Sequence, residues 1–76
     1  MVCFDQHALF QMERRGILSE WVERAPRVPD ETEIRGDKRS FLVRLEGHTE
    51  MLRVVTRIDD PEYVITTYFD RRKPFA

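Results

Sequence analysis

Two strand-like runs near the end of the sequence constrain the fold more than any other feature. They lie within residues 51–72, which read MLRVVTRIDDPEYVITTYFDRR. β-Branched and aromatic residues fill both runs, and such residues favour pleated, half-buried strands. The segment 59–62 between them contains Pro61 after two aspartates. Because proline has a fixed φ and aspartate accommodates turn geometry, the chain reverses there. The sequence therefore predicts an antiparallel hairpin.

Alternation of side chains across each strand predicts which residues share a face of the sheet. In the first run one face carries Leu52, Val54, Thr56 and Ile58, and the other carries Met51, Arg53, Val55 and Arg57. In the second run one face carries Tyr63, Ile65, Thr67 and Phe69, and the other carries Val64, Thr66 and Tyr68. With the more apolar sets facing the core, the second sheet face bears Arg53, Arg57, Thr66 and Tyr68. Arginine offers a planar fork of donors to phosphate, whereas a solvated sheet face explains the same pattern equally well.

A helix is predicted over Phe4–Arg15. Asp5 is placed to cap its start and Gly16 to end it in a left-handed conformation. Apolar residues recur at helical spacing on one side, at Phe4, Ala8, Leu9 and Met12. A neighbouring face carries His7, Gln11, Arg14 and Arg15.

A second, shorter helix is predicted over Glu20–Ala25, with Ser19 as its cap. Its packing face contains Leu18, Trp21, Val22 and Ala25. Strands are then predicted at Thr32–Arg35, Lys38–Glu46 and Glu50–Asp59, the first two joined by a Gly36-Asp37 turn. This order predicts one α+β domain over residues 1–76, with two N-terminal helices packed on one face of a three- to four-stranded antiparallel sheet.

Composition limits what such a domain can do. The 76 residues carry a net charge of −1, which argues against a broadly basic nucleic-acid-binding surface. Residues 1–37 hold 8 acidic and 5 basic side chains, and residues 38–76 hold 6 acidic and 8 basic ones. An anion site is therefore expected on the sheet half. The single cysteine, Cys3, and two unclustered histidines predict neither a metal site nor a cofactor. The sequence has no basic leader followed by an apolar run, so a cytoplasmic protein without membrane contact is predicted.

One group of side chains matches a known chemistry. RNA cleavage by attack of the 2′-OH needs a group that takes up a proton, an acid for the leaving oxygen and cations for the phosphate. The candidate catalytic residues are His7, Arg53 and Tyr68, and the candidate phosphate- or RNA-binding residues are Arg14, Arg15, Arg57 and Thr66. The sequence leaves open whether His7, on a helix, reaches the sheet face.

Several segments resemble a bacterial domain family of unknown function found among toxin-like proteins. They are residues 7–17 (HALFQMERRGI), 19–22 (SEWV), Pro29-Asp30, 52–55 (LRVV) and 64–68 (VITTY). That family is grouped with the RelE and barnase–EndoU–colicin ribonuclease superfamily. The resemblance thus implies a metal-independent ribonuclease fold and points to His7, Arg15, Arg53, Thr66 and Tyr68.

These observations lead to two main hypotheses. The first is a metal-independent RNA endonuclease, the toxin of a toxin–antitoxin pair, with RNA and an antitoxin protein as partners. The alternative is a non-catalytic module that binds protein or RNA, since a short edge strand offers unpaired backbone groups to a partner strand. A domain that keeps the fold without the chemistry is a third possibility.

Overall fold

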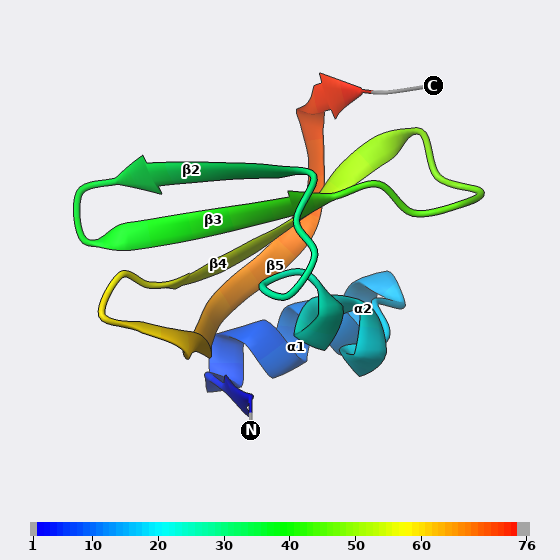
Figure 1. The fold of residues 1–76 in the computed structure, drawn as a ribbon. Coiled ribbons are helices and arrows are strands. Elements are labelled where there is room, and N and C mark those ends of the chain that lie inside the picture. The colour runs from blue at the N-terminus through cyan, green and yellow to red at the C-terminus, as the bar shows by residue number, and fades with distance from the viewer. Residues whose placement is uncertain (1, 75–76) are drawn as a thin grey trace.

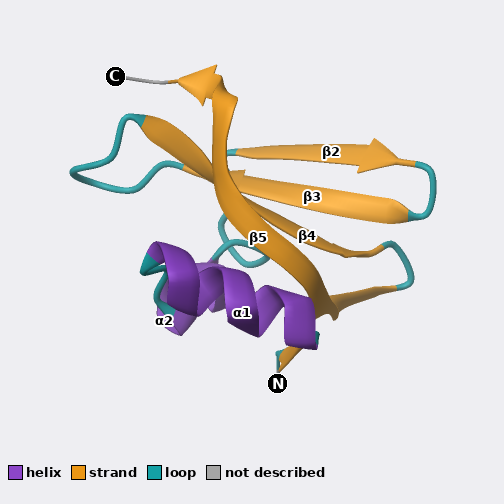
Figure 2. Cartoon of the chain, turned by 180° about the vertical axis from the view of Figure 1, so that it is seen from behind, coloured by secondary structure: helices purple, strands orange, loops and turns teal. Residues whose placement is uncertain are grey.

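The computed structural model describes residues 2–74, and within them the chain forms two helices and five strands (Figure 1). In chain order these are β1 (Cys3–Phe4), α1 (Gln6–Arg15), α2 (Ser19–Arg24), β2 (Glu31–Arg35), β3 (Lys38–Val43), β4 (Glu50–Arg57) and β5 (Asp60–Pro74). The strands form one sheet in the order β1-β5-β4-β3-β2. Both helices lie below this sheet in Figure 1, and α1 lies along β5 in Figure 2. The predicted α+β class is confirmed.

The sheet differs from the prediction in one respect. Strands β2 to β5 pair antiparallel in sequence order, but β1 pairs parallel with β5 through Cys3–Tyr63 and Phe4–Val64. The sheet is therefore five-stranded and mixed, where three to four antiparallel strands were predicted. A two-residue strand is too short to show any alternation in the sequence, and its pairing depends on β5, sixty residues away.

Helix α1 begins at Gln6 rather than at the predicted Phe4, which belongs to β1, and it has the predicted caps at both ends. The Asp5 carboxylate accepts a hydrogen bond from the His7 backbone N–H at 3.1 Å, and Gly16 adopts φ 66° while its N–H bonds to the Met12 carbonyl. Ala8 and Met12 are buried, but Leu9, which helical spacing grouped with them on one side, is 50% exposed. Leu9 lies about 100° around the helix axis from Ala8. Only the Ala8 side of the helix faces the core.

Helix α2 starts one residue earlier than predicted. Leu18 occupies the N-cap position without a side-chain hydrogen bond, and Ser19 is the first helical residue, so the prediction of Ser19 as the cap is wrong. Val22 and Ala25 are fully buried, as their place on the predicted packing face requires. Leu18 is instead 48% exposed.

The core lies between the helices and one face of the sheet. Leu52, Val54 and Thr56 of β4 are fully buried there, as alternation predicts. On β5 the pairing passes from Val55–Thr66 to Thr56–Val64, which leaves Ile65 without a partner. This bulge reverses the alternation. Val64 consequently joins the core rather than the opposite face where it was predicted.

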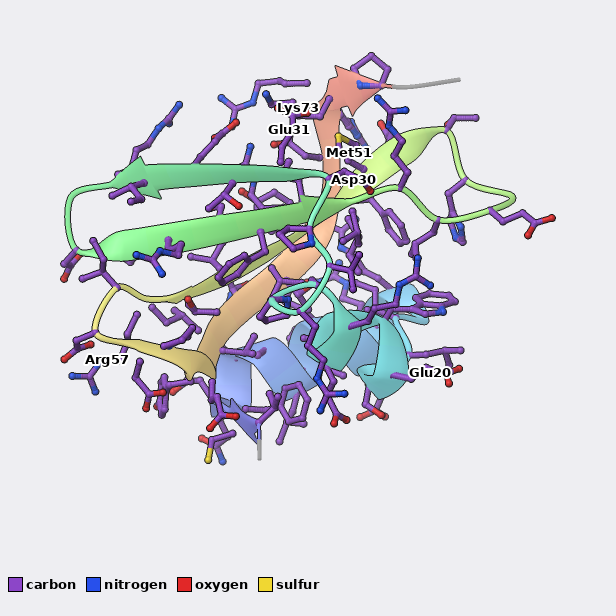
Figure 3. The ribbon with its side chains drawn as sticks, in the orientation of Figure 1. Glu20, Asp30, Glu31, Met51, Arg57 and Lys73 are labelled. Carbon is purple, nitrogen blue, oxygen red and sulfur yellow. The ribbon has the colours of Figure 1, made fainter. Side chains whose placement is uncertain are left out.

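Strand β5 continues beyond Phe69 through the basic tail to Pro74. Its pairing with β4 passes from Met51–Asp70 to Glu50–Pro74, so residues 71–73 lie outside the paired register. Lys73 reaches across to β2, where its Nζ lies 3.2 Å from Glu31 Oε1 and 2.9 Å from Glu33 Oε2. Lys73 and Glu31 are neighbours in Figure 3. The tail thus belongs to the sheet and ends on the side away from the helices (Figure 1).

Candidate functional site

The sheet face away from the helices carries the polar residues that alternation placed there. Arg53 of β4 is directly opposite Tyr68 of β5, and Val55 is opposite Thr66. Residues opposite each other in an antiparallel pair project from the same face. Arg53, Thr66 and Tyr68 therefore form one continuous surface, as predicted.

A first hollow in the surface is lined both by His7 and by residues of this sheet face. His7, Gln11 and Arg15 are spaced four residues apart and so share one side of α1. Strand β1 covers the outer edge of β5 only at Tyr63 and Val64, and beyond these the described residues leave the edge uncovered. The hollow, about 490 Å³ in volume, lies where α1 meets this part of β5. Its lining consists of His7, Gln11, Arg15, Thr66, Tyr68, Phe69, Asp70, Arg71 and Arg72.

A second hollow of about 390 Å³ adjoins the first and shares Thr66, Tyr68 and Arg72 with it. Its other lining residues are Arg35, Lys38, Ser40, Arg53 and Val55. We call the two hollows together the basic groove. Among the described residues that line it, six are basic: Arg15, Arg35, Lys38, Arg53, Arg71 and Arg72. The one acidic residue among them, Asp70, is 3% exposed. Basic residues thus outnumber acidic ones in the lining of the groove, although the whole chain carries a net charge of −1.

Arg53 is held firmly in the wall of the groove. Its Nε and Nη2 lie 2.8 and 2.7 Å from Asp70 Oδ2, and its Nη1 lies 3.0 Å from Glu33 Oε1. Burial acts to lower the pKa of this guanidinium, but the hydrogen bonds to Glu33 and Asp70 outweigh burial and raise the pKa. Arg53 is therefore charged and fixed in orientation, with part of its donor capacity already used.

Asp70 links Arg53 to the tail of β5. Its Oδ1 accepts a hydrogen bond from the Arg72 backbone N–H at 2.9 Å and lies 3.6 Å from Arg72 Nε. Burial acts to raise the pKa of the Asp70 carboxyl, but the hydrogen bonds from Arg72 and Arg53 prevail and lower it. The ionised carboxylate thus fixes both the Arg53 side chain and the Arg72 backbone beside the groove.

His7 and Tyr68 are available to a bound molecule. The His7 side chain is exposed, and Tyr68 is half-buried on the wall that both hollows share. Within residues 2–74, neither the His7 ring nor the Tyr68 hydroxyl makes a hydrogen bond. Imidazole and phenol groups in such positions can exchange protons with a ligand or donate hydrogen bonds to it.

Two of the predicted binding residues lie outside the groove. Arg14 is exposed on α1 and lines neither hollow. Arg57 lies at the turn between β4 and β5 (Figure 3), where its Nε is 3.3 Å from Asp59 Oδ1 and its guanidinium is 5.8 Å from the Tyr63 ring centroid. The structure thus gathers His7, Arg15, Arg53, Thr66 and Tyr68 at the groove, without Arg14 or Arg57.

Sequence reasoning missed Arg35 and Lys38, which flank the turn between β2 and β3. Lys38 and Ser40 are opposite Arg57 and Val55 of β4, and this register puts them on the groove face. Alternation alone does not reveal the register between separate hairpins. The basic tail, residues 70–74, belongs to β5, and its Arg71 and Arg72 line the groove.

Residues 2–74 contain neither a cluster of metal ligands nor an apolar membrane-spanning helix. No three His, Cys, Asp or Glu side chains lie close enough together to hold a metal ion there. Neither described helix is long and apolar enough to cross a membrane.

The sequence profile of DUF4258, a domain of unknown function, matches residues 4–69. The match covers most of the chain, which therefore belongs to this family. No curated protein and no solved structure is significantly similar to it. Membership of a family of unknown function agrees with the coarser part of the resemblance drawn from the sequence, and the relation to RelE-type ribonucleases stays a prediction.

Proposed function

We propose that this DUF4258 domain is an RNA endonuclease that binds the phosphodiester backbone in its basic groove and cleaves it without a metal ion. One observation carries the proposal. A single hollow is lined by His7, whose ring makes no hydrogen bond within residues 2–74, together with Thr66, Tyr68 and the cationic Arg15 and Arg72. These are the groups that proton transfer at a phosphodiester requires.

The proposed reaction is an internal transfer at phosphorus. The 2′-oxygen of a ribose attacks the adjacent phosphate while His7 takes up the 2′-OH proton. The bond from phosphorus to the 5′-oxygen breaks, and that oxygen receives a proton from Tyr68 or from water. The products are a 2′,3′-cyclic phosphate and a 5′-hydroxyl, and the proton on His7 then returns through solvent to the group that protonated the 5′-oxygen, so atoms and charge balance without any cofactor. Histidine suits the first transfer because its ordinary pKa is near neutral.

The cationic residues have two kinds of role in this proposal. Arg15 and Arg72 line the hollow that contains His7, where guanidinium donors stabilise the negative charge that grows on the phosphate oxygens. Arg53 is a positioning residue, because Asp70 and Glu33 already occupy its Nε, Nη2 and Nη1 donors. Its charge is compensated by these two carboxylates, and its ion pairs fix the wall that carries Tyr68.

A second candidate function is RNA binding without cleavage. It is favoured by the absence, within residues 2–74, of any side chain hydrogen-bonded to the His7 ring that would orient it for catalysis. In either case an antitoxin protein that blocks the activity would be expected to cover the groove. Both candidate functions include RNA binding, but only the endonuclease produces new RNA ends.

The first test separates groove residues from other surface arginines. Fluorescence anisotropy with labelled single-stranded RNA is measured for the wild type, Arg15→Gln and the matched control Arg14→Gln, an exposed neighbour on the same helix. Arg15→Gln is expected to weaken binding about tenfold, since a hydrogen bond to a charged group is worth about 1.5 kcal/mol. Arg14→Gln is expected to bind like the wild type. Equal losses for the two variants would contradict the location of the site.

Cleavage is tested on total RNA in EDTA, with and without added ribosomes. The wild type is expected to shorten the RNA, and His7→Gln is expected to be at least about 100-fold slower because it lacks the general base. If the protein binds RNA but cleaves none of it under either condition, RNA binding without cleavage becomes the function that the site supports. Absence of both binding and cleavage would reject the proposal.

A further inference from the structure

Strand β2 forms the edge of the sheet opposite to β1 and has the properties of an edge that accepts another strand. Its register with β3 is regular over all five residues, from Glu31–Leu42 to Arg35–Lys38. It contains no proline, bulge or lysine, which often protect sheet edges from association, although three of its five side chains, those of Glu31, Glu33 and Arg35, are charged. Among the described strands, none pairs with its outer side. The backbone groups on that side are open to a partner.

The side chains of β2 also favour association. Ile34 is 57% exposed on this strand, so its apolar surface is available to a partner. Thr32 and Ile34 are opposite Phe41 and Arg39 of β3, so they share the face that bears the core residue Phe41. The other face carries Glu31, Glu33 and Arg35. The edge strand therefore has an apolar face and a charged face. A partner strand would have to place apolar side chains beside the first and opposite charges beside the second.

We propose that β2 is the interface of a homodimer, in which β2 strands of two copies pair antiparallel about a two-fold axis at Glu33. The sequence of β2, Glu-Thr-Glu-Ile-Arg, is complementary to itself in this register. Glu31 of each copy lies opposite Arg35 of the other, and Thr32 lies opposite Ile34. The two Ile34 side chains are diagonal neighbours on one face, within reach of each other. The two sheets then join into one continuous sheet.

The central contact of this register brings the two Glu33 side chains together. Like charges directly opposite each other destabilise a strand pair. Each Glu33, however, is already neutralised within its own chain, with Oε1 3.0 Å from Arg53 Nη1 and Oε2 2.9 Å from Lys73 Nζ. These internal ion pairs hold each carboxylate toward its own groove and so reduce the repulsion at the axis.

The dimer is expected to be weak. A five-residue strand pair with one exposed isoleucine per copy buries less than the roughly 1,200 Å² at which stable interfaces begin. Association is therefore expected only at high chain concentration. The inference depends on the β2 edge alone, so it stands or falls independently of the endonuclease proposal.

The test is sedimentation velocity from micromolar to millimolar chain concentration. The wild type is expected to shift from monomer to dimer across this range. Ile34→Asp is expected to raise the dissociation constant about tenfold, because it loses two cross-strand contacts per dimer. Leu9→Asp is the matched control, since Leu9 on α1 is 50% exposed and lies away from the β2 edge. It is expected to associate like the wild type.

An exchange of charges between positions 31 and 35 tests the proposed register of the two β2 strands. Arg35→Glu brings like charges together at both ends of the paired strands and is expected to weaken the dimer about tenfold. Adding Glu31→Lys to the same chain restores opposite charges across the interface and is expected to restore association. A wild type that stays monomeric at millimolar concentration overturns the proposal. A dimer unaffected by Ile34→Asp overturns it too, as does a double variant no better than Arg35→Glu.

Discussion

The ion pair between Arg53 and Asp70 is expected to dominate the response of this fold to substitution. The Arg53 side chain is 10% exposed and that of Asp70 is 3% exposed, and they meet at 2.7 and 2.8 Å. Arg53→Met removes the charge while keeping most of the aliphatic chain. Asp70 is then left as a buried carboxylate that retains only the Arg72 backbone N–H at 2.9 Å and Arg72 Nε at 3.6 Å.

The loss of stability in Arg53→Met follows from the environment of Asp70. Breaking a buried pair by removal of one partner costs about 3 to 5 kcal/mol. The bonds that remain to Asp70, and the ion pair of Glu33 with Lys73, place Arg53→Met near the lower figure, at about 3 kcal/mol. A domain of this length is stable by only about 4 to 11 kcal/mol in total. A loss of this size lowers the Tm by about 12 to 24 °C.

The assay is urea unfolding followed by the fluorescence of Trp21, the one tryptophan. The matched control is Arg57→Met, whose ion pair with Asp59 is exposed by 55% and 67% and is expected to contribute less than about 0.5 kcal/mol. The double variant Arg53→Met/Asp70→Leu removes both buried charges and is expected to recover more than half of the loss. Equal losses for Arg53→Met and Arg57→Met would refute the reasoning from burial, and an additive double variant would refute the pairing.

Three further predictions follow from local contacts. Hydrogen bonds from Lys73 and Arg53 lower the pKa of Glu33, and the pKa of Asp70 is lowered as well. The stability that these two carboxylates supply is therefore complete above pH about 5 and is lost as the pH falls through their folded pKa values, which a measurement of Tm against pH checks. The Tyr63 hydroxyl donates a hydrogen bond to Asp5 Oδ1 at 2.9 Å, which raises the pKa of that phenol. The stability that this hydrogen bond supplies is present below pH about 10 and is lost above it. In an absorbance titration, Tyr63→Phe should lose the ionisation step that occurs at the highest pH. Gly16→Ala should cost about 1 kcal/mol in urea unfolding, because φ is 66° there and only the backbone conformation opposes the new methyl group.

The sequence predicts the parts of the fold that depend on neighbouring residues. The cap at Asp5, the left-handed Gly16 and the reversal before Pro61 each involve residues close together in the chain, and each appears in the structure. The core face of β4 was also predictable, because Leu52 and Val54 alternate without interruption. These features need only the period of a helix or a strand and the conformational preferences of single residues.

Other parts depend on contacts that the sequence pattern does not contain. Strict alternation fails at Val64 because the bulge at Ile65 puts Val64 on the core face, while Thr66 and Tyr68 beyond the bulge keep their predicted face. The tail 70–74 forms a strand although its composition is polar, since Asp70 pairs with Arg53 and Lys73 pairs with two glutamates of β2. Such long-range ion pairs have no signature in the local sequence.

Only part of the candidate site was predictable from the sequence, because some of its residues meet through contacts that are distant in the chain. Arg53, Thr66 and Tyr68 share one hairpin, so alternation alone brings them together. His7 reaches the same surface because α1 lies along a stretch of β5 that β1 leaves uncovered, which is a property of the assembled fold. Arg35 joins through the register of a separate hairpin.

Cleavage of a defined RNA oligonucleotide in EDTA, with identification of the new ends, tests the central claim most directly. The account predicts that the wild type produces 2′,3′-cyclic phosphate and 5′-hydroxyl ends, that His7→Gln produces them at least about 100-fold more slowly, and that the matching DNA is not cut. A wild type that binds the oligonucleotide in the groove and leaves it intact, or a His7→Gln variant that cleaves it at an undiminished rate, would contradict the account.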